Sequence, residues 1–206
     1  MKLFIVIVLP FCLISLRMAT VVCSKTAFTC HLDPISNSSM KLILLKNVQN
    51  VNTITENIKN GVWKCAAINP SLILDPFQVA VAANRAVVAQ MLGNMVTKSV
   101  YGEILYNLSL TKNITQSLTK FGVYKQHCVL LCFIIRQKED HSDDVLKQIN
   151  GELCPISDLN KYTDLKQLQD AFKLDSLQCT DNLLDSIVSR MVTKNIVSFN
   201  NRGIIQ

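Results

Sequence analysis

The chain has 206 residues, of which 49% are hydrophobic and 17% are charged. That length is enough for one well-filled domain and too short for two domains of average size. The apolar and charged fractions are those of a globular protein, and they exclude wholesale disorder.

The formal net charge of +6 comes from the middle of the sequence. Between residues 76 and 138, Glu103 is the single acidic residue. The basic residues of this segment are Arg85, Lys98, Lys112, Lys120, Lys125, Arg136 and Lys138. The excess indicates either an anionic partner, such as a phosphate backbone, or a solvated basic face without a ligand.

The N-terminus has the form of a signal peptide. Lys2 precedes an apolar run over residues 3–16, which is short for a membrane span. Met18 is a possible alternative start that would remove this run. Formal glycosylation sequons begin at Asn37, Asn107 and Asn113. Residues 1–24 are interpreted as a signal-like or mis-started extension, and no stable membrane association is expected.

Eight cysteines could form a disulfide set, but their positions favour buried free thiols. Cys128 and Cys132 stand among apolar neighbours in a strand-like run. Cys65, Cys154 and Cys179 are isolated, without the spacing of a bridged mini-domain or a zinc site.

Strand-like and helix-like patterns alternate along the chain. Residues 27–32 and 40–46 predict two strands. Helices are predicted over residues 52–60, 76–92, 100–108, 114–121, 163–172 and 181–192. Residues 129–135 predict a central strand covered on both faces. The predicted fold is α/β, a single domain over residues 25–197 with a mixed central sheet packed with several helices. The tail, 198–206, is expected to be frayed.

The helix predicted over residues 76–92 is almost free of charge. Asp75 fits its N-cap, Pro76 its first position, and Gly93 the position just past its end. Most of its residues are Ala and Val. Such a helix cannot lie on a solvated surface, so it is either buried in the core or covered by a partner, with the core as the safer choice.

The polar exceptions on this helix are candidate contacts. Gln78 and Arg85 could share one helical face, with Asn84 close by, and so could meet a partner. Hydrogen bonding within the core is the alternative for these three side chains. Asn69 and Pro70, just upstream, are expected to shape the turn that leads into the helix.

A search for catalytic chemistry returns little. The six glycines are scattered singly, so no phosphate-binding loop can be built. His31, His127 and His141 have no acid or nucleophile at motif spacing, and a buried Cys128 would be a poor nucleophile. No catalytic residue, metal ligand or cofactor is therefore expected, and the profile is that of a binding subunit.

A series of short motifs then occurs in order from about residue 25 to 197. They include Ile68-Asn-Pro70, Asp75-Pro-Phe-Gln78, Ala82-Ala-Asn-x-Ala86, Met95-x-Thr-Lys98, Glu103-Ile-x-x-Asn-Leu-Ser109, Lys120-Phe-Gly122 and Arg190-Met-x-Thr-Lys194. As an ordered set they resemble the TPRKB family, the small kinase-binding subunit of the EKC/KEOPS complex. The stretch before Lys25 departs from the family, whose members generally lack it.

The resemblance implies a non-catalytic subunit with two partners. One is the small atypical kinase-ATPase of the complex, and the other is tRNA, captured by its 3′ CCA end. The complex adds a threonylcarbamoyl group to the adenosine next to the anticodon, and catalysis resides in other subunits. The implied location is the cytoplasm and nucleus. Lys98, Lys112 and Lys120 are the candidates for phosphate contact, with a solvated surface as the alternative.

Two other classes of function stay open at this point. A secreted or ER-lumenal binding protein would use the signal-like start as a cleaved signal peptide. A small-molecule enzyme is the third class, which the lack of a recognisable site disfavours.

Overall fold

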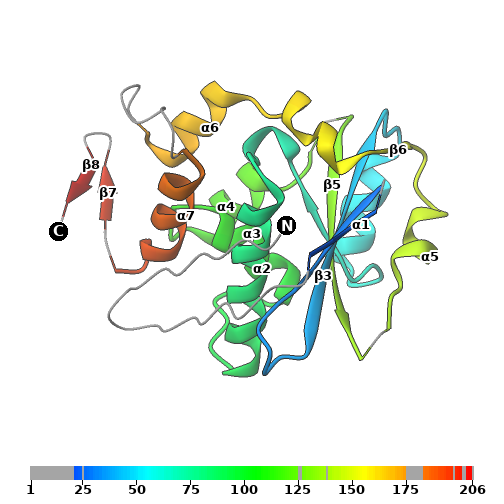
Figure 1. Cartoon of the computed structure of the whole chain (residues 1–206), viewed down its shortest axis with the longest axis horizontal. Helices are drawn as coiled ribbons and strands as arrows, with labels where there is room; N and C mark the ends of the chain where they lie inside the picture. The colour runs from blue at the N-terminus through cyan, green and yellow to red at the C-terminus, as the bar shows by residue number, and fades with distance from the viewer. Residues whose placement is uncertain are drawn as a thin grey trace.

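The centre of the fold is an antiparallel sheet (Figure 1). The computed structural model describes residues 21–24, 26–124, 127–137, 139–174, 183–196, 198–200 and 203–205. Among these, the strands run in the order β1 (Val21–Cys23), β2 (Ala27–His31), β3 (Ser38–Lys46), β5 (Val129–Arg136) and β4 (Ala66–Ile68). A further strand, β6 (Glu152–Cys154), pairs with the end of β3.

Strand β5 lies inside the sheet, between two strands from the first third of the chain. It pairs with β3 from Ser38–Arg136 to Leu45–Val129, and with β4 on its other side. Both neighbours run opposite to β5, so β3 and β4 are parallel to each other without touching. The α/β fold is confirmed. The expectation of a mixed sheet is wrong for the described pairings, because β5 separates the two parallel strands.

Helices cover both faces of the sheet. They are α1 (Val51–Lys59), α2 (Pro76–Met91), α3 (Val100–Leu108), α4 (Ile114–Phe121), α5 (Ser142–Leu146), α6 (Leu165–Phe172) and α7 (Leu183–Thr193), with short 3-10 helices η1 (Pro70–Leu72) and η2 (Ile156–Lys161). Figure 1 shows α2, α3, α4, α6 and α7 on one side of the sheet and α1 and α5 on the other. The large layer packs around α2 and α3.

The side chains of the central strands point alternately to the two faces of the sheet, and they contribute to two separate hydrophobic cores. On β3, Leu42 and Leu44 belong to the core under the large helical layer, whereas Ile43 and Leu45 belong to the core under α1. The side chains of β5 divide in the same way. Because successive residues of a strand point to opposite faces, a strand buried on both faces must be apolar throughout. The prediction that 129–135 is such a strand is confirmed.

The predicted elements agree with the structure to within a few residues, and the omissions are short. Strands β4 and β6 have three residues each, and α5 has five, which is too few for a periodic pattern. The described part of the tail, expected to fray, forms two antiparallel paired strands, β7 (Ser198–Asn200) and β8 (Gly203–Ile205).

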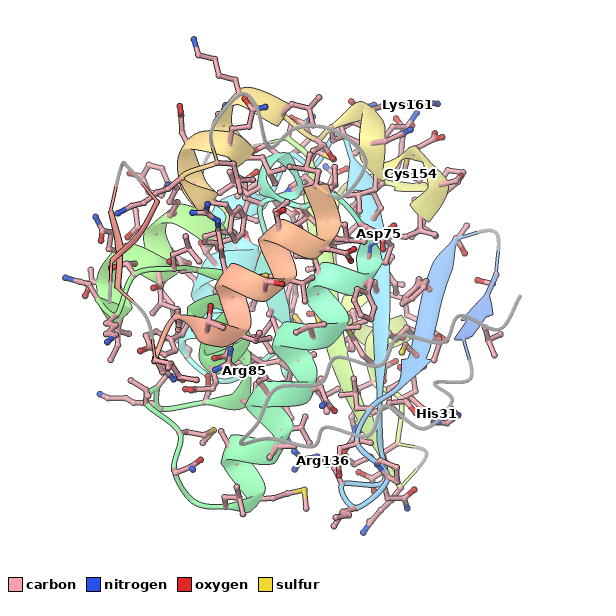
Figure 2. The ribbon with its side chains drawn as sticks, turned by 60° about the vertical axis from the view of Figure 1, so that its left-hand side comes forward. His31, Asp75, Arg85, Arg136, Cys154 and Lys161 are labelled. Carbon is pink, nitrogen blue, oxygen red and sulfur yellow. The ribbon has the colours of Figure 1, made fainter. Side chains whose placement is uncertain are left out.

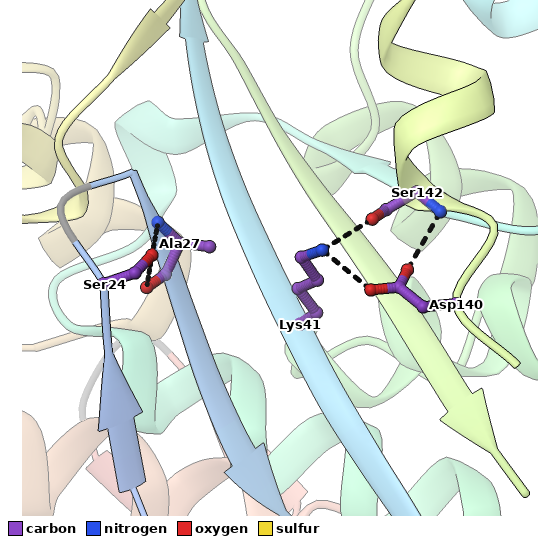
Figure 3. Close-up of polar contacts among 5 residues, drawn as sticks. All are labelled: Ser24, Ala27, Lys41, Asp140 and Ser142. Atoms are coloured by element: carbon purple, nitrogen blue, oxygen red, sulfur yellow. Dashed lines mark hydrogen bonds and ion pairs between the residues drawn. The ribbon is translucent and has the colours of Figure 1, made fainter. Parts of the chain in front are cut away.

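The segment expected to be an extension contributes to the sheet. Strand β1 pairs with β2, and the connection is held by Ser24, whose Oγ accepts a hydrogen bond from the N–H of Ala27 at 2.9 Å (Figure 3). The expected boundary at residue 25 therefore falls between two paired strands.

A polar contact fixes α5 against the second face of the sheet (Figure 3). Lys41 Nζ on β3 donates to Asp140 Oδ2 and to Ser142 Oγ, both at 2.7 Å. The other oxygen of Asp140 accepts from the N–H of Ser142 at 2.9 Å. Burial opposes ionisation of Asp140, but the hydrogen bonds from Lys41 and Ser142 outweigh it and hold its pKa below the ordinary value.

Substitution of Gly122 tests the end of α4. A Cβ atom at this position would lie 2.4 Å from the carbonyl oxygen of Leu118, a backbone atom that cannot move aside. We expect Gly122→Ala to lower the free energy of unfolding by about 1–3 kcal/mol, measured by denaturant titration.

Gly102 provides the matched control. It lies inside α3, and its added Cβ would meet Ser99 and Thr97 at an ordinary 3.4 Å. Gly102→Ala should be neutral or stabilising, because alanine favours the helix interior. Equal effects at the two positions would contradict the steric argument for Gly122.

Candidate functional site

Two side-chain caps build the entrance to α2. Asn69 precedes η1, and its Oδ1 accepts a hydrogen bond from the N–H two residues further on, at 3.1 Å. Asp75 precedes α2, and its Oδ1 accepts from the N–H of Phe77 at 2.7 Å. Pro70 and Pro76 occupy the first positions of the two helices, where a backbone N–H has no helical partner to lose.

The polar side chains Gln78 and Asn84 serve the hydrogen bonding of the fold itself. Gln78 is fully buried, with Oε1 accepting from the N–H of Leu74 at 3.0 Å and Nε2 donating to the carbonyl of Leu72 at 3.1 Å. Asn84 is also buried, and its Oδ1 accepts from the N–H of Asp33 at 2.7 Å. The structure therefore places Gln78 away from any partner-accessible surface, and it uses Asn84 to hold the β2–β3 turn against α2.

Arg85 links α2 to α7 (Figure 2). Its Nη1 donates to the carbonyl of Met191, in the last turn of α7, at 2.6 Å. Arg190 makes a similar contact, since its Nη1 donates to the carbonyls of Phe172 and Lys173 at the end of α6, at 3.2 and 3.0 Å. These carbonyls lack helical donors and carry the negative end of the helix dipole, so a cation suits them.

Lys194 makes a third contact of this kind, at the end of α3. The residue is only 1% exposed, and its Nζ donates to the carbonyls of Tyr106 and of Ser109, the latter at 3.1 Å. The same Nζ lies 3.3 Å from the centre of the Tyr106 ring. Burial and the nearby Arg85 lower the pKa of Lys194 to about 7, against the opposing charge of Glu103.

The internal roles of Arg190 and Lys194 escaped the sequence prediction, although a signal for them exists. Ile187, Arg190, Met191 and Lys194 follow the i, i+3, i+4, i+7 spacing of one buried helical stripe. Basic residues at such positions are expected to seek backbone carbonyls inside the protein.

The three candidate phosphate-binding lysines are exposed, and they lie at different places on the large helical layer. Lys98 precedes α3 and Lys112 follows it, so the nine residues of that helix, roughly 13 Å long, separate them. Lys120 lies in the last turn of α4, where burial and Lys173 lower its pKa and Asp170 opposes them. The structure therefore spreads these lysines along α3 and α4.

A pocket of about 400 Å³ opens at the end of β3 and the start of β5. Its lining includes Asn69, Cys128 and Tyr162. Burial raises the pKa of the Cys128 thiol to about 11, so the thiol is protonated at neutral pH and is a poor nucleophile. Within the described ranges, no three His, Cys, Asp or Glu side chains are grouped as metal ligands.

Two observations bear on the interpretation of a secreted protein. Cysteines 30, 65, 128, 132 and 154 are free thiols, as predicted. Asn107, one of the sequon residues, is buried, and its Nδ2 donates to the carbonyl of Ala82 at 3.4 Å, so the folded chain has no room for a glycan there. Cys179 and residues 1–20 lie outside the described part of the chain. No helix of the described part is both long and apolar enough to cross a bilayer.

The pH dependence of stability tests the environment of Lys194. An unfolded lysine titrates near 10.4, well above the folded-state value of about 7. Between these two values the unfolded chain binds a proton that the folded protein lacks, so this residue makes the free energy of unfolding rise with pH. We expect Lys194→Met to remove that contribution, as measured by urea titration at several pH values from 7 to 9.

Lys166→Met is the control, because Lys166 is exposed on α6. It should leave the slope of stability against pH unchanged. If Lys194→Met has the slope of the wild type as well, the lowered pKa of Lys194 is wrong. At pH 7, Lys194→Met should also cost roughly 1–3 kcal/mol, because it leaves two enclosed carbonyls without their donor.

Comparison with known proteins gives a consistent result. Residues 45–195 match the family model described as kinase binding protein CGI-121. The zebrafish protein named EKC/KEOPS complex subunit TPRKB is 32% identical over 158 residues, which cover 75% of this chain and 90% of the relative. The Yarrowia lipolytica subunit CGI121 is 28% identical over 145 residues, covering 68% and 83%. The Schizosaccharomyces pombe subunit cgi121 is 26% identical over 164 residues, covering 76% and 94%.

The matched segment runs from the end of β3 to two residues past α7, and so includes α2 with its caps, the three candidate lysines and the buried basic side chains. This chain belongs to the CGI-121 family of kinase binding proteins.

Proposed function

We propose that this protein is a non-catalytic subunit of an EKC/KEOPS complex, in which it binds the kinase-ATPase subunit and helps to recruit tRNA. The observation that carries the proposal is the family match over residues 45–195, together with relatives that are named subunits of this complex. In the proposed reaction, tRNA is held by its 3′ CCA end while other subunits add threonylcarbamoyl to the adenosine next to the anticodon. The proposal locates the protein in the cytoplasm and nucleus, which imaging of a C-terminally tagged copy tests.

Most of the apolar surface of α2 is buried in the protein's own core, and the small part that stays exposed supports a protein partner of limited contact area. Most of the helix belongs to the core, as was the safer expectation, with residues such as Val79, Ala83 and Val87 fully buried. The apolar side chains that remain exposed are Met91 and Leu92 at its end. Methionine is enriched in interfaces between separately folded subunits relative to the rest of the protein surface.

Support for RNA binding comes from the basic side chains that make no polar contact within the described part of the fold. Arg85 and Arg136 are not among them, because Arg85 donates to a carbonyl of α7 and Arg136 donates to Gln90. Lys98, Lys112 and Lys120 form no ion pair with any described residue, so their ammonium groups remain available for phosphate.

Direct mixing tests the kinase partner. We expect the purified protein and the purified kinase-ATPase subunit to elute together from a sizing column at micromolar concentration. Nuclease treatment of both samples excludes bridging by RNA, and an unrelated kinase domain serves as the negative control. Separate elution of the treated proteins would count against the kinase-binding part of the proposal.

Charge reversal tests the RNA partner. The triple change Lys98→Glu, Lys112→Glu and Lys120→Glu should weaken binding of a tRNA transcript about tenfold or more at 0.1 M salt, and each lost phosphate contact should reduce the salt slope by about one. Fluorescence anisotropy over a salt series measures both quantities.

The matched control for this series is Lys59→Glu, on α1 at the other side of the sheet. It makes the same type of charge change away from the proposed surface. If Lys59→Glu weakens RNA binding as much as a single change at any of the three lysines, the loss of affinity comes from net charge and not from a specific surface. Unchanged affinity in the triple variant would refute the RNA-binding part of the proposal.

A further inference from the structure

The carboxylate of Glu103 holds the loop between α2 and α3. The side chain belongs to the first turn of α3 and is only 3% exposed. Its Oε2 accepts hydrogen bonds from the N–H of Val96 at 3.1 Å, and from the N–H and the hydroxyl of Thr97, both at 2.7 Å. No described basic side chain forms an ion pair with it at contact distance. These three donors stabilise its charge directly, and Lys194 interacts with that charge at longer range.

The loop is fixed on both sides of Lys98. Residues before it are held by Glu103, and Ser99 after it caps α3 by accepting from the N–H of Gly102 at 3.1 Å. At the start of the loop, Gly93 has a φ of 67°, which ends α2 and turns the chain. Lys98 is exposed and in no ion pair with a described residue. An exposed side chain thus projects from a backbone whose position is set by a buried acid.

A fixed backbone reduces the entropy lost when a lysine binds a phosphate group. The change in RNA affinity on neutralising Glu103 distinguishes this role from a simple effect of charge. Glu103 is negative and close to a positive surface, so removal of its charge alone should strengthen binding of a polyanion. If the residue acts by fixing the loop, its neutralisation should instead weaken that binding. The two explanations therefore predict opposite changes.

We propose that Glu103 is a positioning residue for RNA, acting through Lys98 by fixing the loop that presents this lysine to a phosphate group. The inference rests on the proposed function, because it takes RNA as the partner of Lys98. It adds a buried acidic residue, which touches no RNA, to the residues that determine RNA affinity.

A double-mutant cycle tests the proposal. Binding of a tRNA transcript is measured by fluorescence anisotropy over a salt series for wild type, Glu103→Gln, Lys98→Ala and the double variant. Lys98→Ala should weaken binding about 3- to 10-fold and lower the salt slope by about one. Glu103→Gln should weaken binding about 2- to 5-fold, and should add nothing in the background of Lys98→Ala.

Glu56→Gln is the matched control, because Glu56 is exposed on α1 and loses the same charge. It should leave binding unchanged or slightly stronger. If Glu103→Gln also strengthens binding, or weakens it equally with and without Lys98, the proposal is overturned. If Lys98→Ala does not change RNA affinity, the RNA contact of Lys98 in the proposed function is refuted, and the role of Glu103 through Lys98 is refuted with it.

Thr97→Val keeps the test decisive if Glu103→Gln does not fold. This change removes one donor to Glu103, alters no charge and keeps the volume of the side chain. It should weaken RNA binding about twofold in the presence of Lys98 only, while exchange of the backbone amides at positions 96 and 97 becomes faster. Unchanged RNA affinity with faster exchange of both amides would overturn the link between the loop and binding.

Discussion

Carbonyl groups at the ends of helices govern how the large helical layer is assembled. The last carbonyls of a helix have no partner within the helix, and here the ends of α3, α6 and α7 are covered by neighbouring elements. Each end receives a basic side chain from another part of the chain: Arg85 reaches α7, Arg190 reaches α6, and Lys194 reaches α3. The cations also meet the negative ends of the helix dipoles. Helix α7, or Lys194 just after its end, takes part in all three contacts, so polar groups as well as its apolar stripe hold this helix in place.

The same contacts show that part of the positive charge of the chain serves the fold and is not available for a partner. Charge counted along the sequence treats Arg85 and Lys98 alike, yet the first satisfies a carbonyl of α7 and the second is exposed. A basic segment is therefore a weak predictor of a binding surface until the carbonyls of the fold have been assigned their donors. After that assignment, the described basic residues of segment 76–138 that stay exposed without a bond to another helix are Lys98, Lys112 and Lys120.

Long elements of this fold could be predicted because their own patterns determine them. The Asp75 cap, Pro76 and Gly93 delimit α2, and the continuous apolar run of 129–135 indicates a strand covered on both faces. Strands β4 and β6 could not be predicted, since three residues carry no period. Their existence depends on unpaired backbone groups of β5 and β3. The place of β5 between β3 and β4 is likewise decided by long-range pairing.

The candidate site shows the same limit. Gln78, Asn84 and Arg85 could be recognised as polar exceptions on an apolar helix, but their partners come from other segments, as with the N–H of Asp33 for Asn84. No local pattern states which backbone group will lie opposite a buried amide. Arg190 and Lys194 are different, because their spacing alone places them on the buried stripe of α7. For them the information was present in the sequence.

The central position of β5 has a consequence for how the chain acquires its structure. Each of its pairings joins residues that are far apart in the sequence, with Ser38 opposite Arg136 and Ala66 opposite Cys132. Such contacts form slowly, because a long loop must close before any pairing stabilises it. During synthesis, β3 and β4 leave the ribosome well before β5, and the backbone N–H and C=O groups that will pair with β5 have no partner until it arrives. Until residues 129–136 arrive, the nascent chain must keep those edges from other strands, and this interval is its period of greatest exposure to aggregation.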